Sequence, residues 1–241
     1  MANIYRRAIE RAQREYVISW PFLDGEQTDK GPPLRSELDI EEEMIDLYTI
    51  VTALLSSPGG KLLLFIGSQE GEGTSTLIRE FARVAYVQFN KSVFLLDLVS
   101  SPSPQKYNEE RSLEVIGQEP DLMGKMLDEL TDSRFLVCPV SKLGGSLTRV
   151  LGSPHLESLF GKLRQQFDFI LIDSPPATRS AVGLALAHKT DGVLLVVEAD
   201  KTRWAVARHV KNQIIQAHGN ILGVILNKRR YYIPSFIYKW L

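Results

Sequence analysis

The chain has 241 residues, 44% of them hydrophobic and 24% charged, with a formal net charge of −1, which fits one globular domain plus a tail and predicts no nucleic-acid partner. Its single cysteine, Cys138, excludes an internal disulfide and indicates a reducing compartment. The residues up to Trp20 are mixed polar and basic, unlike a signal peptide, and no apolar run approaches the roughly 20 residues of a membrane-spanning helix, so we expect a cytoplasmic protein.

Charge is distributed unevenly along the chain. Residues 37–46 carry six acids and no lysine or arginine, whereas residues 201–241 carry eight lysines and arginines and no acid. One interpretation is that both segments are solvated faces. The other is that the basic end meets an acidic partner or the anionic surface of a membrane.

The chain divides into three parts. Residues 1–36 form an N-terminal appendage and linker, in which a short basic segment is followed by a stretch rich in proline and glycine. Residues 37–230 carry regular apolar patterns and form the main domain, and residues 231–241 form an aromatic and basic C-terminal segment.

The main domain alternates helices and strands. Apolar residues at helical spacing predict helices over 40–55, 74–89, 121–130, 155–167, 181–190 and 202–219. Short, continuously apolar runs predict strands over 61–66, 93–97, 135–139, 169–173, 193–198 and 221–226. Because the strands are apolar throughout, we expect an α/β fold in which one mostly parallel sheet is covered by helices on both faces.

A glycine-rich turn joins the first strand to the helix that follows it, in the segment KLLLFIGSQEGEGTSTL (61–77). Strand, glycine-rich turn and helix form the setting of a phosphate-binding loop, in which backbone N–H groups and the helix N-terminus face an anion. The usual pattern places Lys-Ser or Lys-Thr after the last glycine, but Thr74 follows Gly73 here. The loop therefore has the scaffold of a nucleotide site without its central cation; alternatively, it is only a tight connection.

Two aspartates follow buried strands. Asp97 and Asp173 each end a predicted strand, and the carboxyl ends of parallel strands share the sheet edge where ligands bind. With the Ser75 hydroxyl at the start of the helix, they predict a Mg²⁺ site beside the loop. Alternatively, either aspartate only caps a turn or a helix.

These segments resemble a known family, the bacterial tyrosine kinases of polysaccharide export of the CpsD/CapB type, which are P-loop ATPases related to MinD and ParA. The resemblance spans residues 38–230. GEG followed by Ser75 and Thr76 is similar to the family's PGEGKST, and FDFILIDSPP is similar to its second Walker motif, with Asp173 in the aspartate position. GNILGVILNK is similar to its last core strand, whose asparagine, here Asn227, contacts the adenine.

The resemblance implies ATP and Mg²⁺ as cofactors and assigns roles to particular residues. The nucleotide-binding residues are Gly71, Glu72, Gly73, Thr74, Ser75, Thr76 and Asn227. Ser75, Asp97 and Asp173 are the metal ligands, and the two aspartates are the catalytic residues, vestigial if the protein is inactive. Tyr231, Tyr232 and Tyr238 partly match the family's C-terminal tyrosine cluster and are candidate phosphotyrosines.

Three motifs depart from the family pattern. Thr74 replaces the phosphate-loop lysine, and Val99 replaces the second aspartate of the Asp-x-Asp-x-Arg motif after the second strand. In the first helix of the domain, Asp46 and Thr49 replace two arginines that help to form a ring in the family, so we expect that contact to be lost. Erosion of three functional motifs on an intact packing pattern is typical of a pseudokinase.

We therefore expect a cytoplasmic pseudo-ATPase that binds Mg-ATP weakly or not at all and that regulates or scaffolds exopolysaccharide or capsule production. The resemblance implies a membrane co-polymerase that sets chain length as its partner, which would place the protein at the inner membrane. The alternatives are an active tyrosine autokinase of the same pathway and a MinD/ParA-like positioning ATPase. The C-terminal segment, RRYYIPSFIYKWL, either docks on the partner or packs on the protein's own sheet.

Overall fold

The computed structural model describes residues 40–55, 58–99, 134–139 and 155–229. Its six strands form one sheet in the order β3-β2-β4-β1-β5-β6, and every neighbouring pair is parallel. The strands are β1 (Lys61–Gly67), β2 (Val93–Asp97), β3 (Phe135–Pro139), β4 (Phe169–Ser174), β5 (Gly192–Glu198) and β6 (Ile221–Asn227). All six predicted strands are thus confirmed, with bounds that differ by at most one residue.

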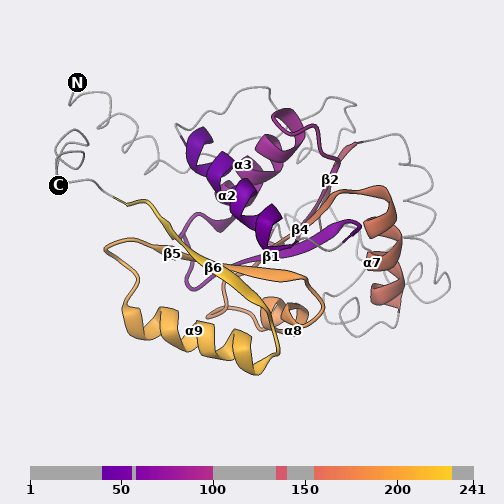
Figure 1. Cartoon of the computed structure of the whole chain (residues 1–241). Coiled ribbons are helices and arrows are strands. Elements are labelled where there is room, and N and C mark those ends of the chain that lie inside the picture. The colour runs from indigo at the N-terminus through magenta and orange to yellow at the C-terminus, as the bar shows by residue number, and fades with distance from the viewer. Residues whose placement is uncertain (1–39, 56–57, 100–133, 140–154, 230–241) are drawn as a thin grey trace, which may run out of the picture.

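Helices cover both faces of this sheet (Figure 1). One face carries α2 (Glu41–Leu54) and α3 (Thr74–Val87), and the other carries α7 (His155–Gln166), α8 (Val182–Ala187) and α9 (Trp204–Gln216). The predicted helices over these ranges are confirmed, although α8 is shorter than expected. The predicted helix over 121–130 lies outside the described residues.

Strand β1 shows why the strands are apolar without interruption. Leu62, Leu64 and Ile66 belong to the core beneath α7, α8 and α9, whereas Leu63 and Phe65 belong to the core beneath α2 and α3. All five side chains are fully buried. Because successive residues of a strand point to opposite faces, a sheet covered on both faces requires an apolar residue at every position.

A buried ion cluster fixes α2 against α3. The guanidinium of Arg83 in α3 is fully buried and donates to the Glu80 carboxylate at 2.9 Å and to the Glu41 carboxylate of α2 at 3.1 Å. Burial of a charge is tolerated only when it is paired and hydrogen-bonded. The cluster therefore ties the first turn of α2 to α3, while Met44, Tyr48 and Val51 form the buried side of α2.

Candidate nucleotide site

The predicted phosphate loop runs from Ser68 to Gly73, between the end of β1 and the start of α3. Gly71 and Gly73 have φ angles of 81° and 86°, in the left-handed region that favours glycine. A Cβ atom on Gly73 would lie 2.4 Å from Nδ2 of Asn227, so a larger residue there would clash with the end of β6. The predicted loop geometry, with the backbone turned tightly at the helix N-terminus, is therefore present.

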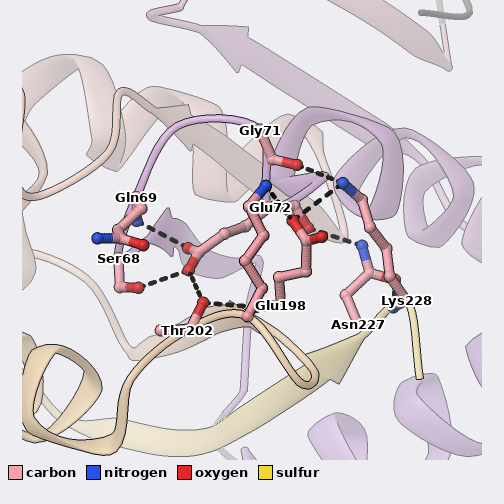
Figure 2. Close-up of polar contacts among 9 residues, drawn as sticks. Ser68, Gln69, Gly71, Glu72, Glu198, Thr202, Asn227 and Lys228 are labelled. Atoms are coloured by element: carbon pink, nitrogen blue, oxygen red, sulfur yellow. Dashed lines mark hydrogen bonds and ion pairs between the residues drawn. The ribbon is translucent and has the colours of Figure 1, made fainter. Parts of the chain in front are cut away.

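Glu72 lies at the centre of the loop and is 2% exposed (Figure 2). Its carboxylate accepts hydrogen bonds from the Ser68 hydroxyl at 2.6 Å and from the backbone N–H of Gln69 at 2.8 Å, both within the loop. It also accepts one at 2.6 Å from the hydroxyl of Thr202, which follows β5. One buried side chain thus closes the loop on itself and ties it to the connection between β5 and α9.

The end of β6 contacts the other side of the loop. The side-chain amide of Asn227 donates to the backbone carbonyl of Glu72 at 2.8 Å, and its oxygen accepts the backbone N–H of Lys228 (Figure 2). The Lys228 ammonium donates to the Gly71 carbonyl at 2.5 Å and pairs with the Glu198 carboxylate at 3.1 Å. Asn227, the predicted adenine contact, thus uses both ends of its amide within the protein.

The missing cation is not replaced from the β6 side. Thr74, Ser75 and Thr76 form the half-buried first turn of α3 and include no lysine. The ammonium of Lys228 reaches the loop, but it binds a carbonyl oxygen and a carboxylate. Its charge therefore stabilises the loop at the Gly71 carbonyl, whereas a phosphate-loop lysine must face the phosphates.

Asp97 and Asp173 lie opposite each other at the ends of the neighbouring strands β2 and β4. Both are about 1% exposed. The Asp97 carboxylate accepts the backbone N–H of Val99 at 2.9 Å and pairs at 3.3 Å with Arg79, which lies on α3 one turn beyond Ser75. The predicted pair of strand-end carboxylates is therefore brought together, with a guanidinium beside it.

Asp173 is the unsatisfied member of the pair. Neither carboxylate oxygen has a hydrogen bond of good geometry among the described residues, although the Ser75 hydroxyl is close enough to favour the ionised form. Burial and the charge of Asp97 raise the pKa of Asp173 to about 7, and Ser75 and Arg79 oppose that rise. A buried carboxylate with two free oxygens requires a proton, a water or a cation.

The residues partly fit a divalent cation. Asp173 and Ser75 offer oxygen atoms for Mg²⁺, which would supply positive charge beside bound phosphates. Asp97, the other predicted ligand, already carries the Arg79 ion pair. The described residues contain no group of three or more histidine, cysteine, aspartate or glutamate side chains that could hold a metal ion.

Replacement of Asp173 by asparagine should stabilise the protein at neutral and alkaline pH. The folded-state pKa of Asp173 is about 7, above the ordinary value of 3.8, so the folded protein binds this proton more tightly than the unfolded chain does. The free energy of unfolding therefore falls as pH rises between these two values, because the unfolded chain ionises first. In thermal unfolding with EDTA, the melting temperature of Asp173→Asn should exceed that of the wild-type protein at pH 8, and the difference should be smaller at pH 5. An equal difference at both pH values would contradict the raised pKa.

At the mouth of the loop, Glu70 pairs with Arg179 at 3.2 Å, and both side chains are exposed. The charge of Glu70 would repel a phosphate, and Arg179 offsets that charge.

The candidate phosphotyrosines, Tyr231, Tyr232 and Tyr238, lie outside the described residues. Sequence reasoning missed Arg79, Thr202 and Lys228; only Arg79 had a local signal, because it lies four residues after Ser75 on the same side of a helix.

Comparison with known proteins identifies relatives across most of the chain. No protein-family model matches it. The tyrosine-protein kinase CpsD of Streptococcus agalactiae is 26% identical over 178 residues, which are 72% of this chain and 76% of that protein. The succinoglycan biosynthesis transport protein ExoP of Rhizobium meliloti is 23% identical over 188 residues, which are 73% of this chain and 23% of that protein.

Solved structures give the same fold. The kinase domain of the Escherichia coli tyrosine kinase ETK superposes with a TM-score of 0.62 at 17% identity, covering 92% of this chain and 90% of that one. The six-stranded parallel sheet with a loop of phosphate-binding geometry is therefore a P-loop fold. The chain is thus similar in sequence to bacterial tyrosine kinases of the CpsD type, and it shares its fold with the kinase domain of one such enzyme.

Proposed function

We propose that this protein is a kinase-like pseudo-ATPase that regulates or scaffolds exopolysaccharide or capsule production together with a membrane co-polymerase. The observation that carries the proposal is the phosphate loop: Thr74 stands in the lysine position, while Glu72 and Lys228 hold the loop in shape from within the protein. A loop that is braced in this way keeps its fold without a nucleotide. ExoP, a relative named for succinoglycan biosynthesis, supports the assignment to polysaccharide production.

A second candidate is an active ATP-dependent tyrosine autokinase of the same pathway. The observation that favours it is Asp173, whose two unpaired, buried oxygens suit a cation that accompanies ATP. In this case Arg79, beside Asp97, would supply charge that the loop itself lacks. The two candidates differ in whether nucleotide chemistry is needed for polysaccharide production.

A genetic test separates these candidates. Strains that express Asp173→Asn in place of the wild-type protein should produce normal amounts of polysaccharide if the protein is a scaffold, because the substitution removes a metal ligand without disturbing packing. If the protein is an active kinase, the variant strain should resemble the deletion strain. Immunoblotting for equal protein levels is the control, and phosphotyrosine that appears only in the wild-type strain would contradict the scaffold proposal.

The membrane partner is tested through residues 231–241. We expect this aromatic and basic segment to dock on the co-polymerase, with anionic lipid adding attraction to its bases. The described residues contain no helix long and apolar enough to cross a membrane. Deletion from Tyr231 onward should leave the melting temperature unchanged but remove the protein from the membrane fraction. If the truncated protein unfolds and the full chain is absent from the membrane fraction, the segment instead packs in the protein's own core.

A further inference from the structure

The segment that follows β4 runs beside the phosphate loop that follows β1. The two strands are parallel neighbours and end side by side. Just beyond their ends, the backbone N–H of Ala177 donates to the Gly67 carbonyl at 2.9 Å, and the Thr178 hydroxyl donates to the Ser68 carbonyl at 2.9 Å. Two successive residues after β4 are therefore fixed to two successive residues at the start of the loop.

Arg179, the next residue, directs its guanidinium to the same loop. Pro175 and Pro176 restrict the backbone before it, and the backbone N–H groups of Arg179 and Ser180 both donate to the Pro176 carbonyl, at 2.9 and 3.0 Å, which closes a tight turn. From this turn the guanidinium pairs with the Glu70 carboxylate at 3.2 Å. The backbone of Arg179 is thus held in place at the mouth of the loop.

Two other cations among the described residues contact the site, and acids with little exposure hold both. The Asp97 side chain, which pairs with Arg79, is 1% exposed, and the Glu198 side chain, which pairs with Lys228, is 15% exposed. Taking the cation away from such an acid would leave a desolvated charge without a partner, which is strongly unfavourable. These two cations are therefore held by the protein's own acids.

The pair of Arg179 with Glu70 differs because it is solvated. The two side chains are 68% and 77% exposed, and pairs of this kind contribute little to stability. A phosphate group carries a charge of about −1.5 to −2 at neutral pH and three acceptor oxygens, whereas a carboxylate carries a single charge. A guanidinium binds either group through two parallel hydrogen bonds. A phosphate that reaches the loop can therefore displace the Glu70 carboxylate from Arg179.

We propose that Arg179 is the residue that recognises phosphate at this loop and that Glu70 competes with the ligand for it. Without ligand, Glu70 occupies the guanidinium; a small molecule with a terminal phosphate, either a nucleotide or a free polyphosphate, takes its place. The two buried, unpaired oxygens of Asp173, at the end of β4, suit the cation that accompanies such a ligand. The inference rests on the proposed function in one respect, that Thr74 leaves the loop without a cation of its own.

The experiment is a titration of the full chain with inorganic pyrophosphate and with ATP, at equal free Mg²⁺, followed by the NMR shifts of backbone amides, which also report weak binding. The variants are Glu70→Gln alone and Glu70→Gln combined with Arg179→Gln or with Arg179→Lys. Glu157→Gln is the matched control, because Glu157 is an exposed glutamate on α7 that pairs with Lys189, and its loss changes the net charge equally. All variants alter exposed side chains, so unchanged melting temperatures confirm that they fold.

We expect Glu70→Gln to bind pyrophosphate about threefold or more tightly than the wild-type chain, because the competing carboxylate and its repulsion are both removed. Glu157→Gln should bind as the wild-type chain does. Adding Arg179→Gln to Glu70→Gln should weaken binding by about tenfold or more, since a charged hydrogen bond to the ligand is lost. Arg179→Lys should weaken it less, because the ammonium retains the charge without the paired donors of a guanidinium.

The proposal is overturned if Glu70→Gln binds pyrophosphate and ATP no more tightly than the wild-type chain or the Glu157→Gln control does. It is also overturned if Arg179→Gln leaves the affinity of the Glu70→Gln chain unchanged. With the expected dependence on Arg179, tighter binding of ATP than of pyrophosphate identifies the ligand as a nucleotide, and equal binding identifies it as a free polyphosphate. These affinities report neither phosphorylation nor polysaccharide production, so the proposed function, tested in strains, can fail or stand independently.

Discussion

Replacing Glu72 with alanine should destabilise the protein by about 2–4 kcal/mol. The substitution removes a buried carboxylate that accepts hydrogen bonds from the Ser68 hydroxyl, the Gln69 N–H and the Thr202 hydroxyl. A buried donor left without a partner, such as the Ser68 hydroxyl, costs about 1–3 kcal/mol. The Gln69 N–H and the Thr202 hydroxyl are only partly buried, and loss of the desolvated carboxylate offsets part of the cost. For a domain of this size the melting temperature should fall by roughly 5–15 °C.

Glu70 provides a matched control within the same loop. It is the same residue type two positions earlier, but its side chain is exposed and its ion pair with Arg179 is solvated. Such pairs contribute about 0–1 kcal/mol, so Glu70→Ala should leave the melting temperature almost unchanged. Hydrogen exchange gives a local readout, because the Gln69 N–H should exchange faster in Glu72→Ala and not in Glu70→Ala. Equal effects of the two substitutions would show that Glu72 does not brace the loop.

The fold could be predicted from the sequence because the determining signal is local. A strand that is apolar at every position, such as LLLFI in β1, requires cover on both faces, and the alternation with helices then requires a parallel sheet. The pairing of Asp97 with Asp173 also followed from local patterns, since each aspartate ends a strand and the ends of parallel strands share an edge.

The bracing of the loop could not be predicted in the same way. The contact from Thr202 to Glu72 joins residues 130 positions apart, and that from Lys228 to Gly71 joins residues 157 positions apart. Both depend on the position of β5 beside β1, on that of β6 beside β5, and on side-chain directions at the strand ends, which no periodicity in the sequence encodes. The sequence predicts Glu72 as one of the nucleotide-binding residues of the loop, whereas in the structure its carboxylate accepts hydrogen bonds from Ser68, Gln69 and Thr202.

The nucleotide site itself is tested by restoring the missing lysine. The wild-type protein should bind Mg-ATP weakly or not at all, because Thr74 cannot supply the charge that a phosphate-loop lysine brings to the β- and γ-phosphates. A charged hydrogen bond contributes about 1.5–3 kcal/mol, so Thr74→Lys should tighten Mg-ATP binding by roughly 10- to 150-fold in calorimetry.

Thr76→Lys is the control for this gain, because it adds the same charge to the same half-buried first turn of α3 at a position that the family motif does not use for lysine. The Thr74 hydroxyl and the Glu72 carboxylate both lie close to Gly67, so a lysine at position 74 has a neighbouring carboxylate. That ion pair would reduce the gain toward the lower end of the range. The interpretation is that the loop binds Mg-ATP weakly because it has no lysine at position 74. A low-micromolar dissociation constant for the wild-type protein would contradict it, and so would equal gains in Mg-ATP affinity from Thr74→Lys and Thr76→Lys.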